Sequence, residues 1–443
     1  MDLKLSFTDK EVTPWSGTVL LKKMLDRMGF DVQLDKLPLP VQGSNRGYDP
    51  KQLIKQFMTS VWCGANKFEH CEITRHDEVL RQCWGFKRMA GSKSFQRFFN
   101  KHTTALNHHI FTPFYQWFFS NLQFDNYTLD VDSSIFTRYG NQQGSKKGYN
   151  PQKPGRKSHH PLIAFIEETR MVANFWLRSG NTHASNNIQG FVCDTIDKLN
   201  GKKIGLFRGD SGFYGKEVFE FLEDHPLVSN YIIAARQYQP IQQKIAGHTL
   251  WTKVTRGIEV AETTYQSPLW DKERRLVMVR QLVTERPNAT GKSLRLFEEQ
   301  GIYNRYRYSC FITDVTLPPL QVWNLYKQRA NCENRIKELK YDFGSDNFNL
   351  KSFDATEAAL NWVMIAYNLI SLFRQVVLNT KVENRMKTLR YQVFAIGGYV
   401  VKNGNQRLLK LSLAMKRREW FTGLWNCNKT SFYFHGNGIR NNW

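Results

Sequence analysis

The chain has 443 residues, 41% hydrophobic and 14% aromatic, a composition that excludes a disordered chain and predicts about two or three globular domains. Lysine and arginine outnumber aspartate and glutamate by 62 to 39, which gives a formal net charge of +23. Such an excess favours a polyanionic partner, above all nucleic acid, over a merely basic protein without one.

The cysteines, the N-terminus and the apolar stretches exclude further classes of protein. The seven cysteines are scattered without a Cys-x-x-Cys pair, which indicates reduced thiols in a cytoplasmic protein. Three of them, at 63, 71 and 83, lie near two histidines, but the spacing fits no common zinc pattern and buried thiols are favoured. The opening residues are polar and mixed in charge, unlike a signal peptide. The apolar stretch 358–373 is short for a membrane span and predicts a core helix, so no membrane partner is expected.

Residues 1–125 predict a helical N-terminal DNA-binding domain. Apolar side chains recur there at three- and four-residue spacing, as on helices with one buried face. The segment 91–102 starts with Gly-Ser, offers Ser92 as an N-cap and carries three cations, Lys93, Arg97 and Lys101. It fits the recognition helix of a helix-turn-helix motif, or equally a surface helix packed by its phenylalanines.

From residue 126 the pattern changes to short runs rich in β-branched and aromatic residues, separated in part by helical stretches. Over residues 126–378 this pattern predicts an α/β domain, a mixed sheet flanked by helices. Alternating, hairpin-like segments predict a β-rich insertion at about 245–305 and a return to the main sheet near 307–314. Two long helices are predicted to follow, at 318–341 and 354–378.

Residues 379–443 predict a basic, helical C-terminal region. Ten lysines and arginines stand against two acidic residues between positions 381 and 420. Such an excess fits either a solvated face or a DNA contact, and the charge of the whole chain favours DNA.

Two of the strand-like runs carry acidic side chains at their carboxyl ends. In "LDVDSS" the two-residue period of a strand places Asp130 and Asp132 on one face. In "RGDSGF" Asp210 ends its run, and the adjacent glycines permit a sharp turn. Open α/β sheets place their sites at such strand ends, although a turn or N-cap acid is the ordinary alternative.

A third acid, Glu333, lies on the predicted helix 318–341 and shares one face with Tyr326, Arg329 and Lys340. On a regular helix these four side chains project within a sector of roughly 60°. A surface helix with an Arg329–Glu333 ion pair would account for that face alone.

If this helix packs beside the strand ends, Asp132, Asp210 and Glu333 converge. Three carboxylates together suit divalent cations, since Mg²⁺ prefers carboxylate, water and phosphate oxygens. Two such ions, roughly 3.5–4 Å apart, can activate a nucleophile and stabilise the leaving oxygen of a phosphodiester. The neighbouring residues Tyr326, Arg329 and Lys340 would then hold phosphates of the strand being cut.

The spacing Tyr326-x2-Arg329-x3-Glu333-x6-Lys340 resembles the Tyr-Arg-Glu-Lys signature of DDE transposases from bacterial insertion sequences. "LDVDSS" looks like the first-aspartate block of that family and "RGDSGF" like its second, in the family's order. The resemblance extends from about residue 75 into the basic tail near residue 425. It implies a ribonuclease H-like core, in the branch that carries a β-rich insertion. It also implies metal-dependent hydrolysis at transposon ends, followed by strand transfer into target DNA.

The resemblance implies roles for individual residues and partners. Asp132, Asp210 and Glu333 would be the catalytic and metal-binding acids, holding two Mg²⁺ or Mn²⁺ ions. Asp132 is favoured as the first acid because it directly precedes two serines, with Asp130 as the alternative ligand or as a neighbour that tunes it. The implied partners are transposon ends, target DNA and a second copy in a homodimeric synaptic complex, in a bacterial, nucleoid-associated cytoplasmic setting.

The stretch after the first acid block holds no acidic residue between Asp132 and Glu167 and many cations. We predict a DNA-facing loop that becomes ordered on binding, rather than a merely solvated one. Its DNA-binding candidates are Lys146, Lys147, Arg156 and Lys157. The two histidines that follow, at 159 and 160, fit strand-capping surface positions better than the site itself.

The insertion contains Trp251 and Trp270. In relatives of this branch a tryptophan of the insertion stacks on a flipped base, and each of these two is a candidate for that role. A core tryptophan is the ordinary alternative.

Two other functions compete with transposition. One is a ribonuclease H-like nuclease acting on other nucleic acid, and the other is a non-catalytic DNA-binding regulator derived from a transposase. The complete four-residue signature, the insertion and the basic tail favour transposition over both.

Overall fold

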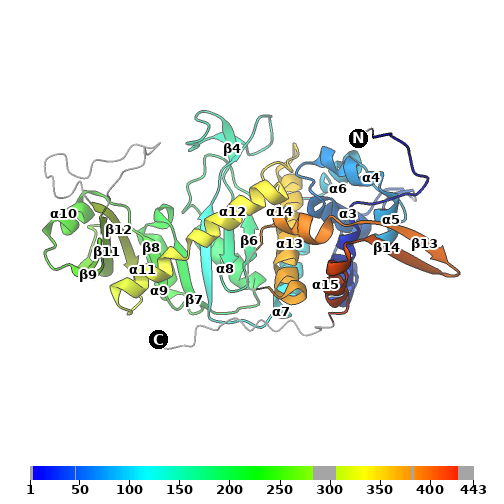
Figure 1. Ribbon diagram of the computed structural model, residues 1–443. Helices are drawn as coiled ribbons and strands as arrows, with labels where there is room; N and C mark the ends of the chain where they lie inside the picture. Colours follow the sequence, from blue (N-terminus) through cyan, green and yellow to red (C-terminus); the bar gives the residue numbers. More distant parts are fainter. Residues whose placement is uncertain (1–2, 45, 283–305, 381–383, 428–443) are drawn as a thin grey trace.

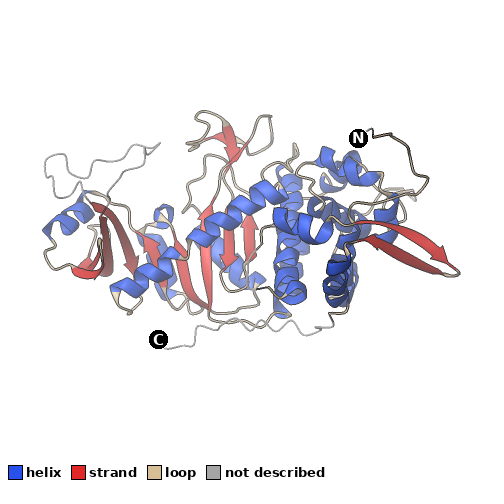
Figure 2. Cartoon of the chain, in the orientation of Figure 1, coloured by secondary structure: helices blue, strands red, loops and turns tan. Residues whose placement is uncertain are grey.

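The computed structural model describes residues 3–44, 46–282, 306–380 and 384–427. A long sheet occupies one end and the middle of the molecule, and a group of helices built from both chain ends occupies the other (Figures 1 and 2). The helix α12 runs obliquely across the view between these two parts (Figure 1).

The N-terminal helices are short, and two of the longer ones have clear start signals. Asp49 accepts a hydrogen bond from Lys51 N–H and Pro50 takes the first position of α3, while the Thr103 hydroxyl accepts from Leu106 N–H at the start of α7. The predicted N-cap at Ser92 is off by one residue, because Gly91 is the cap and Ser92 begins the helix. The helices are α1 (Val19–Arg27), α2 (Phe30–Asp35), α3 (Pro50–Trp62), α4 (Cys71–Arg75), α5 (Glu78–Trp84), α6 (Ser92–Phe99) and α7 (Thr104–Ser120).

The apolar stretch near 358–373 forms most of α13 (Phe353–Phe373), the most buried helix of the chain as described. It packs against α3 and α7 on one side and against the strand β6 (Met171–Trp176) on the other. The phenylalanines of α6 also join this core, so packing explains them without a role in DNA recognition.

The central sheet has nine strands in the order β6-β5-β1-β7-β8-β12-β11-β10-β9. The strand β1 (Tyr127–Ser133) lies antiparallel to β5 (Leu162–Ile166) and parallel to β7 (Ile204–Gly209), which lies parallel to β8 (Tyr231–Ala234). With α8 (Ile188–Lys198) and α9 (Lys216–Asp224) between the parallel strands, this is the ribonuclease H-like arrangement that the sequence implied.

The β-rich insertion continues this sheet rather than forming a separate layer. The strand β12 (Tyr306–Thr313) pairs with β8, which confirms the return to the main sheet near 307–314. Beyond it, successive antiparallel pairs add the remaining strands, and residues 283–305 of the predicted insertion lie outside the described residues. These elements are α10 (Gln239–Gly247), β9 (Thr252–Thr255), β10 (Ile258–Tyr265) and β11 (Arg274–Leu282).

The single helix predicted at 318–341 is wrong, because the structure has two, α11 (Pro319–Lys327) and α12 (Ala330–Phe343). A regular helix would bond the Leu325 carbonyl to Arg329 N–H, but this carbonyl accepts from Arg208 at 2.5 Å. Arg329 N–H donates instead to the Tyr326 carbonyl at 2.9 Å. A buried arginine of the sheet thus takes one carbonyl out of the helical ladder and breaks the helix there.

Two further segments are strands where the sequence suggested otherwise. The basic loop after β1 folds as a small three-stranded sheet, β2 (Phe136–Thr137), β4 (Lys157–His159) and β3 (Lys146–Lys147). The C-terminal region, predicted as helical, has helices α14 (Met386–Leu389) and α15 (Met415–Trp425), but between them a hairpin of β13 (Gly397–Asn403) and β14 (Gln406–Ser412).

Candidate active site

The register of β1 and β7 places the predicted aspartates side by side. Val131 lies opposite Gly209, so the next residues, Asp132 and Asp210, leave neighbouring parallel strands at the same level. Neighbouring strands are about 4.8 Å apart, so two like charges start from adjacent positions at this edge of the sheet. Two residues earlier, Asp130 lies opposite Arg208 in the same way.

The inner pair, Asp130 and Arg208, is a closed ion pair. The Arg208 guanidinium donates from Nε and Nη2 to the two carboxylate oxygens of Asp130, at 2.6 and 2.8 Å. Both side chains are buried. Since both oxygens of Asp130 are already bonded, Asp130 is poorly placed to bind a cation, which favours Asp132 as the first acid.

The outer pair has spare carboxylate oxygens instead. Asp132 Oδ1 accepts from Ser133 N–H at 2.8 Å, and Asp210 Oδ1 accepts from Gly212 N–H at 2.8 Å, as in the turn acid that was the ordinary alternative. Burial raises the pKa of Asp132 to about 6, and the charges of Asp210 and Glu333 add to this shift while Arg329 opposes it. The negative charges of the outer pair are therefore only partly balanced by nearby positive charge.

Glu333 lies in the first turn of α12, with 57% of its side chain exposed, at the open side of the strand ends. The helix is fixed there by Glu167, which follows β5. Glu167 accepts from Asn331 at 2.9 Å and from Arg335 at 2.7 Å, on either side of Glu333. Glu167 also lies 3.6 Å from Arg208, so one buried network links the inner ion pair to the helix that carries Glu333.

The cation now among these acids is Arg329. Its Nη2 lies 3.1 Å from Asp132 Oδ1, and its Nη1 lies 3.9 Å from Glu333 Oε1. In the described part of the chain, no three His, Cys, Asp or Glu side chains are grouped closely enough to hold a metal ion. The donor types nevertheless suit a hard divalent cation, because the charges of Asp210 and Glu333 both act on Asp132 and one guanidinium, that of Arg329, opposes them.

The two remaining signature residues lie on either side of the acids. Tyr326, on α11, packs its ring against Phe311 with centroids 4.5 Å apart, and burial raises its pKa to about 12. Lys340 donates to the Ile135 carbonyl at 3.1 Å and lies over the Phe136 ring, and burial lowers its pKa. Because of the helix break, the four residues do not share one helix face; they line a path from α11 past the acids to the small sheet.

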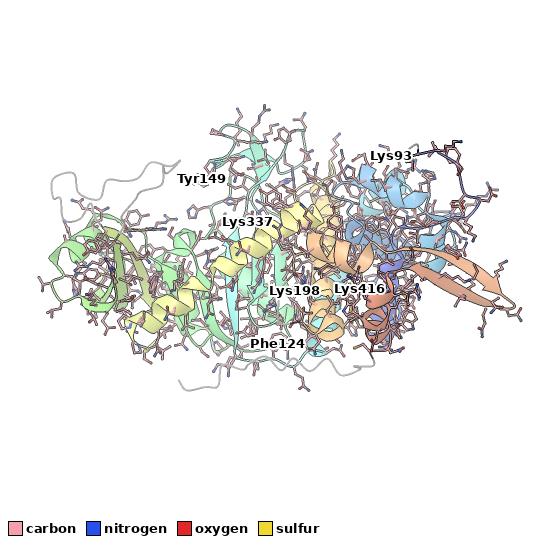
Figure 3. All side chains as sticks on the ribbon, viewed as in Figure 1. Lys93, Phe124, Tyr149, Lys198, Lys337 and Lys416 are labelled. Atoms are coloured by element: carbon pink, nitrogen blue, oxygen red, sulfur yellow. The ribbon has the colours of Figure 1, made fainter. Side chains whose placement is uncertain are left out.

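The predicted DNA-binding lysines and arginine of the loop are exposed on the small sheet, and none has an ion-pair partner among the described residues; they are Lys146, Lys147, Arg156 and Lys157. Tyr149, beside this sheet, and Lys337, on α12, lie on the same upper side in Figure 3. The exposed side of the small sheet is therefore basic, which suits a phosphate backbone.

The histidines after this loop are buried, so the prediction of surface positions is wrong. His159 Nδ1 accepts from Arg138 Nε at 3.0 Å, and its Nε2 donates to the Gln143 carbonyl at 2.9 Å. His160 Nδ1 donates to the Thr182 carbonyl at 2.9 Å. Both rings hold loops together.

The two candidate tryptophans have different surroundings. Trp270 is 6% exposed and packs in an aromatic cluster with Phe219 and Tyr265, as a core tryptophan does. Trp251 is half-buried, with Arg280 stacked on its ring at 4.4 Å. Only Trp251 keeps part of its surface available.

Sequence reasoning missed the residues that hold the acids in place, namely Arg208, Glu167, Asn331 and Arg335. A signal for Arg208 was present. It stands two residues before Asp210, as Asp130 stands two before Asp132, so a strand period of two puts both pairs on one face. Glu167 carried no comparable signal, since its partners are more than 160 residues away.

A family model described as transposase DDE domain, group 1, matches residues 1–427 and so includes all three acids. Among solved structures, the chain is similar to a piggyBac transposase in a synaptic complex with hairpin DNA, at 12% identity and a TM-score of 0.47. That similarity covers 87% of this chain and 81% of that one. The comparison with curated proteins gives no match. The family match spans almost the full length, and the chain therefore belongs to the transposase DDE domain family, group 1.

Proposed function

We propose that this DNA transposase cuts DNA at the ends of a bacterial insertion sequence and joins the freed 3′-hydroxyl to target DNA, using Asp132, Asp210 and Glu333. Membership of the family makes the chain a metal-dependent enzyme of DNA strand cleavage and transfer. The assignment of these three residues, of two Mg²⁺ or Mn²⁺ ions and of an insertion sequence as the element is our proposal.

The observation that carries the assignment is the parallel register that sets Asp132 level with Asp210, with α12 holding Glu333 beside them. These carboxylates would hold the ions, which when bound supply an activated oxygen nucleophile and stabilise the leaving oxygen. Arg329 would turn from Asp132 to a phosphate of the bound strand, since a guanidinium binds phosphate through paired donors.

The DNA would follow the path marked by the signature. Tyr326 and Lys340 would position the strand on either side of the acids, and the exposed cations of the small sheet would hold the flanking phosphates. We propose that residues 1–125 add a DNA-binding domain, 126–378 the catalytic domain and 379–443 a basic region that contacts DNA.

A homodimeric synaptic complex in the bacterial cytoplasm is part of the same proposal, since joining two ends requires both to be held at once. In the parts of the chain that the structure describes, no helix is long and apolar enough to cross a membrane.

The test is cleavage of a duplex that carries the element's own ends, with Mg²⁺ or Mn²⁺, by wild type and Glu333→Gln. The matched control is Glu217→Gln, which makes the same change at an exposed glutamate of α9. We expect nicking at the element boundary to fall about a thousandfold or more in Glu333→Gln and to persist in the control. Cleavage that survives Glu333→Gln would place the active site elsewhere.

Two other results would select the competing functions. Cleavage without preference for the element's ends would favour the ribonuclease H-like nuclease. Specific binding without cleavage by wild type would favour the regulator.

A further inference from the structure

The β13–β14 hairpin projects from the body of the molecule as a two-stranded arm, at the end opposite to β9–β11 (Figure 1). Only its base is tied down. Thr13 and Gly398 exchange two backbone hydrogen bonds, at 2.9 and 3.0 Å, and Ser16 N–H donates to the Ile396 carbonyl. From Lys402 to Leu408 every residue is exposed, so the outer half of the arm is open to solvent.

The charge on this arm is of one sign. Residues 397–412 contain no Asp or Glu. Lys402 lies directly opposite Arg407 across the two strands, and like charges at opposed positions destabilise a sheet. Arg407 lies close enough to Glu78 of α5 for its charge to help lower the pKa of that carboxyl. Both oxygens of Glu78, however, already accept hydrogen bonds from Arg81. A tip with this charge suits an external polyanion as its partner.

The cations occur on both faces of the ribbon. Alternation along the strands puts Lys402 and Arg407 on one face and Lys410, opposite Tyr399, on the other. A ribbon that lies in a DNA groove has a phosphate wall on each side, so this distribution fits a groove better than a flat surface.

The uncharged residues of the tip are amides. Asn403, Asn405 and Gln406 are exposed and make no side-chain hydrogen bond within the described residues. Gly404, with a φ of 59°, takes the first turn position, where a two-residue hairpin turn needs positive φ. Asn and Gln pair with adenine edges, and the DNA major groove admits a two-stranded ribbon.

We propose that the β13–β14 hairpin enters the major groove of duplex DNA and reads bases there. The cations Lys402, Arg407 and Lys410 contact phosphates of both walls, and the amides of Asn403, Asn405 and Gln406 contact base edges. The proposal takes from the proposed function only that DNA is the partner, because the hairpin lies away from the acids. The bases that it reads are therefore separate from the bond that is cut.

The test measures binding to a duplex with the element's terminal repeats and to a scrambled duplex of equal length and composition, in EDTA. One variant changes the amides, Asn403→Ala with Gln406→Ala. A second changes the charges, Lys402→Gln with Arg407→Gln and Lys410→Gln. A control changes three exposed cations elsewhere, Lys203→Gln with Lys244→Gln and Lys253→Gln. Thermal melting of each variant checks that it folds.

We expect the amide variant to lose about tenfold or more of its preference for the repeats, with scrambled binding unchanged. The charge variant should bind both duplexes more weakly and lower the slope of log affinity against log salt by about 2–3, which the control should not do. Footprinting of wild type and the amide variant should differ at bases away from the cleavage site.

Preference and salt slope equal to those of the control would overturn the proposal. So would a hairpin variant that binds DNA normally but loses self-association, since the arm would then join two copies. Neither result depends on cleavage, and loss of cleavage in Glu333→Gln would stand in either case.

Discussion

Two pairs of side chains lie two residues apart along β1 and β7, and they have the same geometry but opposite electrostatics. The inner row pairs Asp130 with Arg208, and the outer row sets Asp132 beside Asp210. In the inner row each charge is cancelled by its direct neighbour. In the outer row two negative charges meet, and Glu333 adds a third while Arg329 balances one of them.

The comparison teaches that position on the strands does not distinguish structural from catalytic acids. Burial is tolerable for Asp130 because its partner is at hydrogen-bond distance, whereas Asp132 is held with its charge only partly compensated. The negative charge of the outer row that Arg329 does not balance attracts cations. The rows should therefore respond in opposite ways to loss of a carboxylate.

The largest expected effect is on catalysis in the outer row. Asp132→Asn should lower metal-dependent cleavage about a thousandfold or more, because it removes a ligand charge while keeping the shape. The rate of nicking on element ends measures this. Asp224→Asn, which removes an exposed carboxylate from the same domain, should cut at the wild-type rate. Normal cleavage by Asp132→Asn would remove the distinction between the rows.

The next effect is on the stability of the protein and comes from the inner row. Asp130→Asn should lower the free energy of unfolding by about 3–5 kcal/mol, because it leaves Arg208 buried with only the more distant charge of Glu167, 3.6 Å away, to balance it. Denaturant unfolding measures the loss. The double variant Asp130→Leu with Arg208→Met, which removes both charges, should recover much of it. If Asp130→Asn were as stable as wild type, the inner pair would have no structural role.

A smaller effect concerns the contribution of Asp132 to the free energy of unfolding, measured in EDTA so that no metal is bound. The pKa of Asp132 is about 6 when folded and about 3.9 when unfolded, so the folded chain holds the proton more tightly. Stability from this group is full below pH 4 and is lost as pH rises through 6. Asp132→Asn should thus be more stable than wild type by about 2–3 kcal/mol at pH 8 but not at pH 4. A gain independent of pH, from melting at several pH values, would contradict this cause.

The smallest expected effect distinguishes a residue that positions the DNA strand for cleavage from one that only adds to DNA affinity. Lys340→Met should slow cleavage about tenfold while changing the DNA dissociation constant less than about twofold, since it supplies one phosphate contact among many. Lys203→Met, which makes the same change at an exposed lysine elsewhere in the domain, serves as the control. An equal loss of cleavage and affinity in Lys340→Met would show that it acts only through binding.

The sequence could predict features with a local cause. The strand period placed Asp130 with Asp132, a glycine-flanked turn marked Asp210, and apolar content alone marked α13. It could not predict the break between α11 and α12, since no glycine or proline marks that point. The cause is Arg208, which is more than 100 residues away. The C-terminal hairpin was missed because its anchor is Thr13, at the other end of the chain.

The packing of α3 on α13 means that the first helix must wait during synthesis for its partner to be made. The indole Nε1–H of Trp62 donates to the Ala366 carbonyl, 304 positions later. A ribosome that adds about 5–20 residues per second needs roughly 15–60 s to travel that distance. Throughout that interval the apolar sides of the N-terminal helices have no α13 to cover them, and the nascent chain depends on chaperones or on local collapse to stay soluble. Rare codons between these two helices would lengthen this interval without changing any residue.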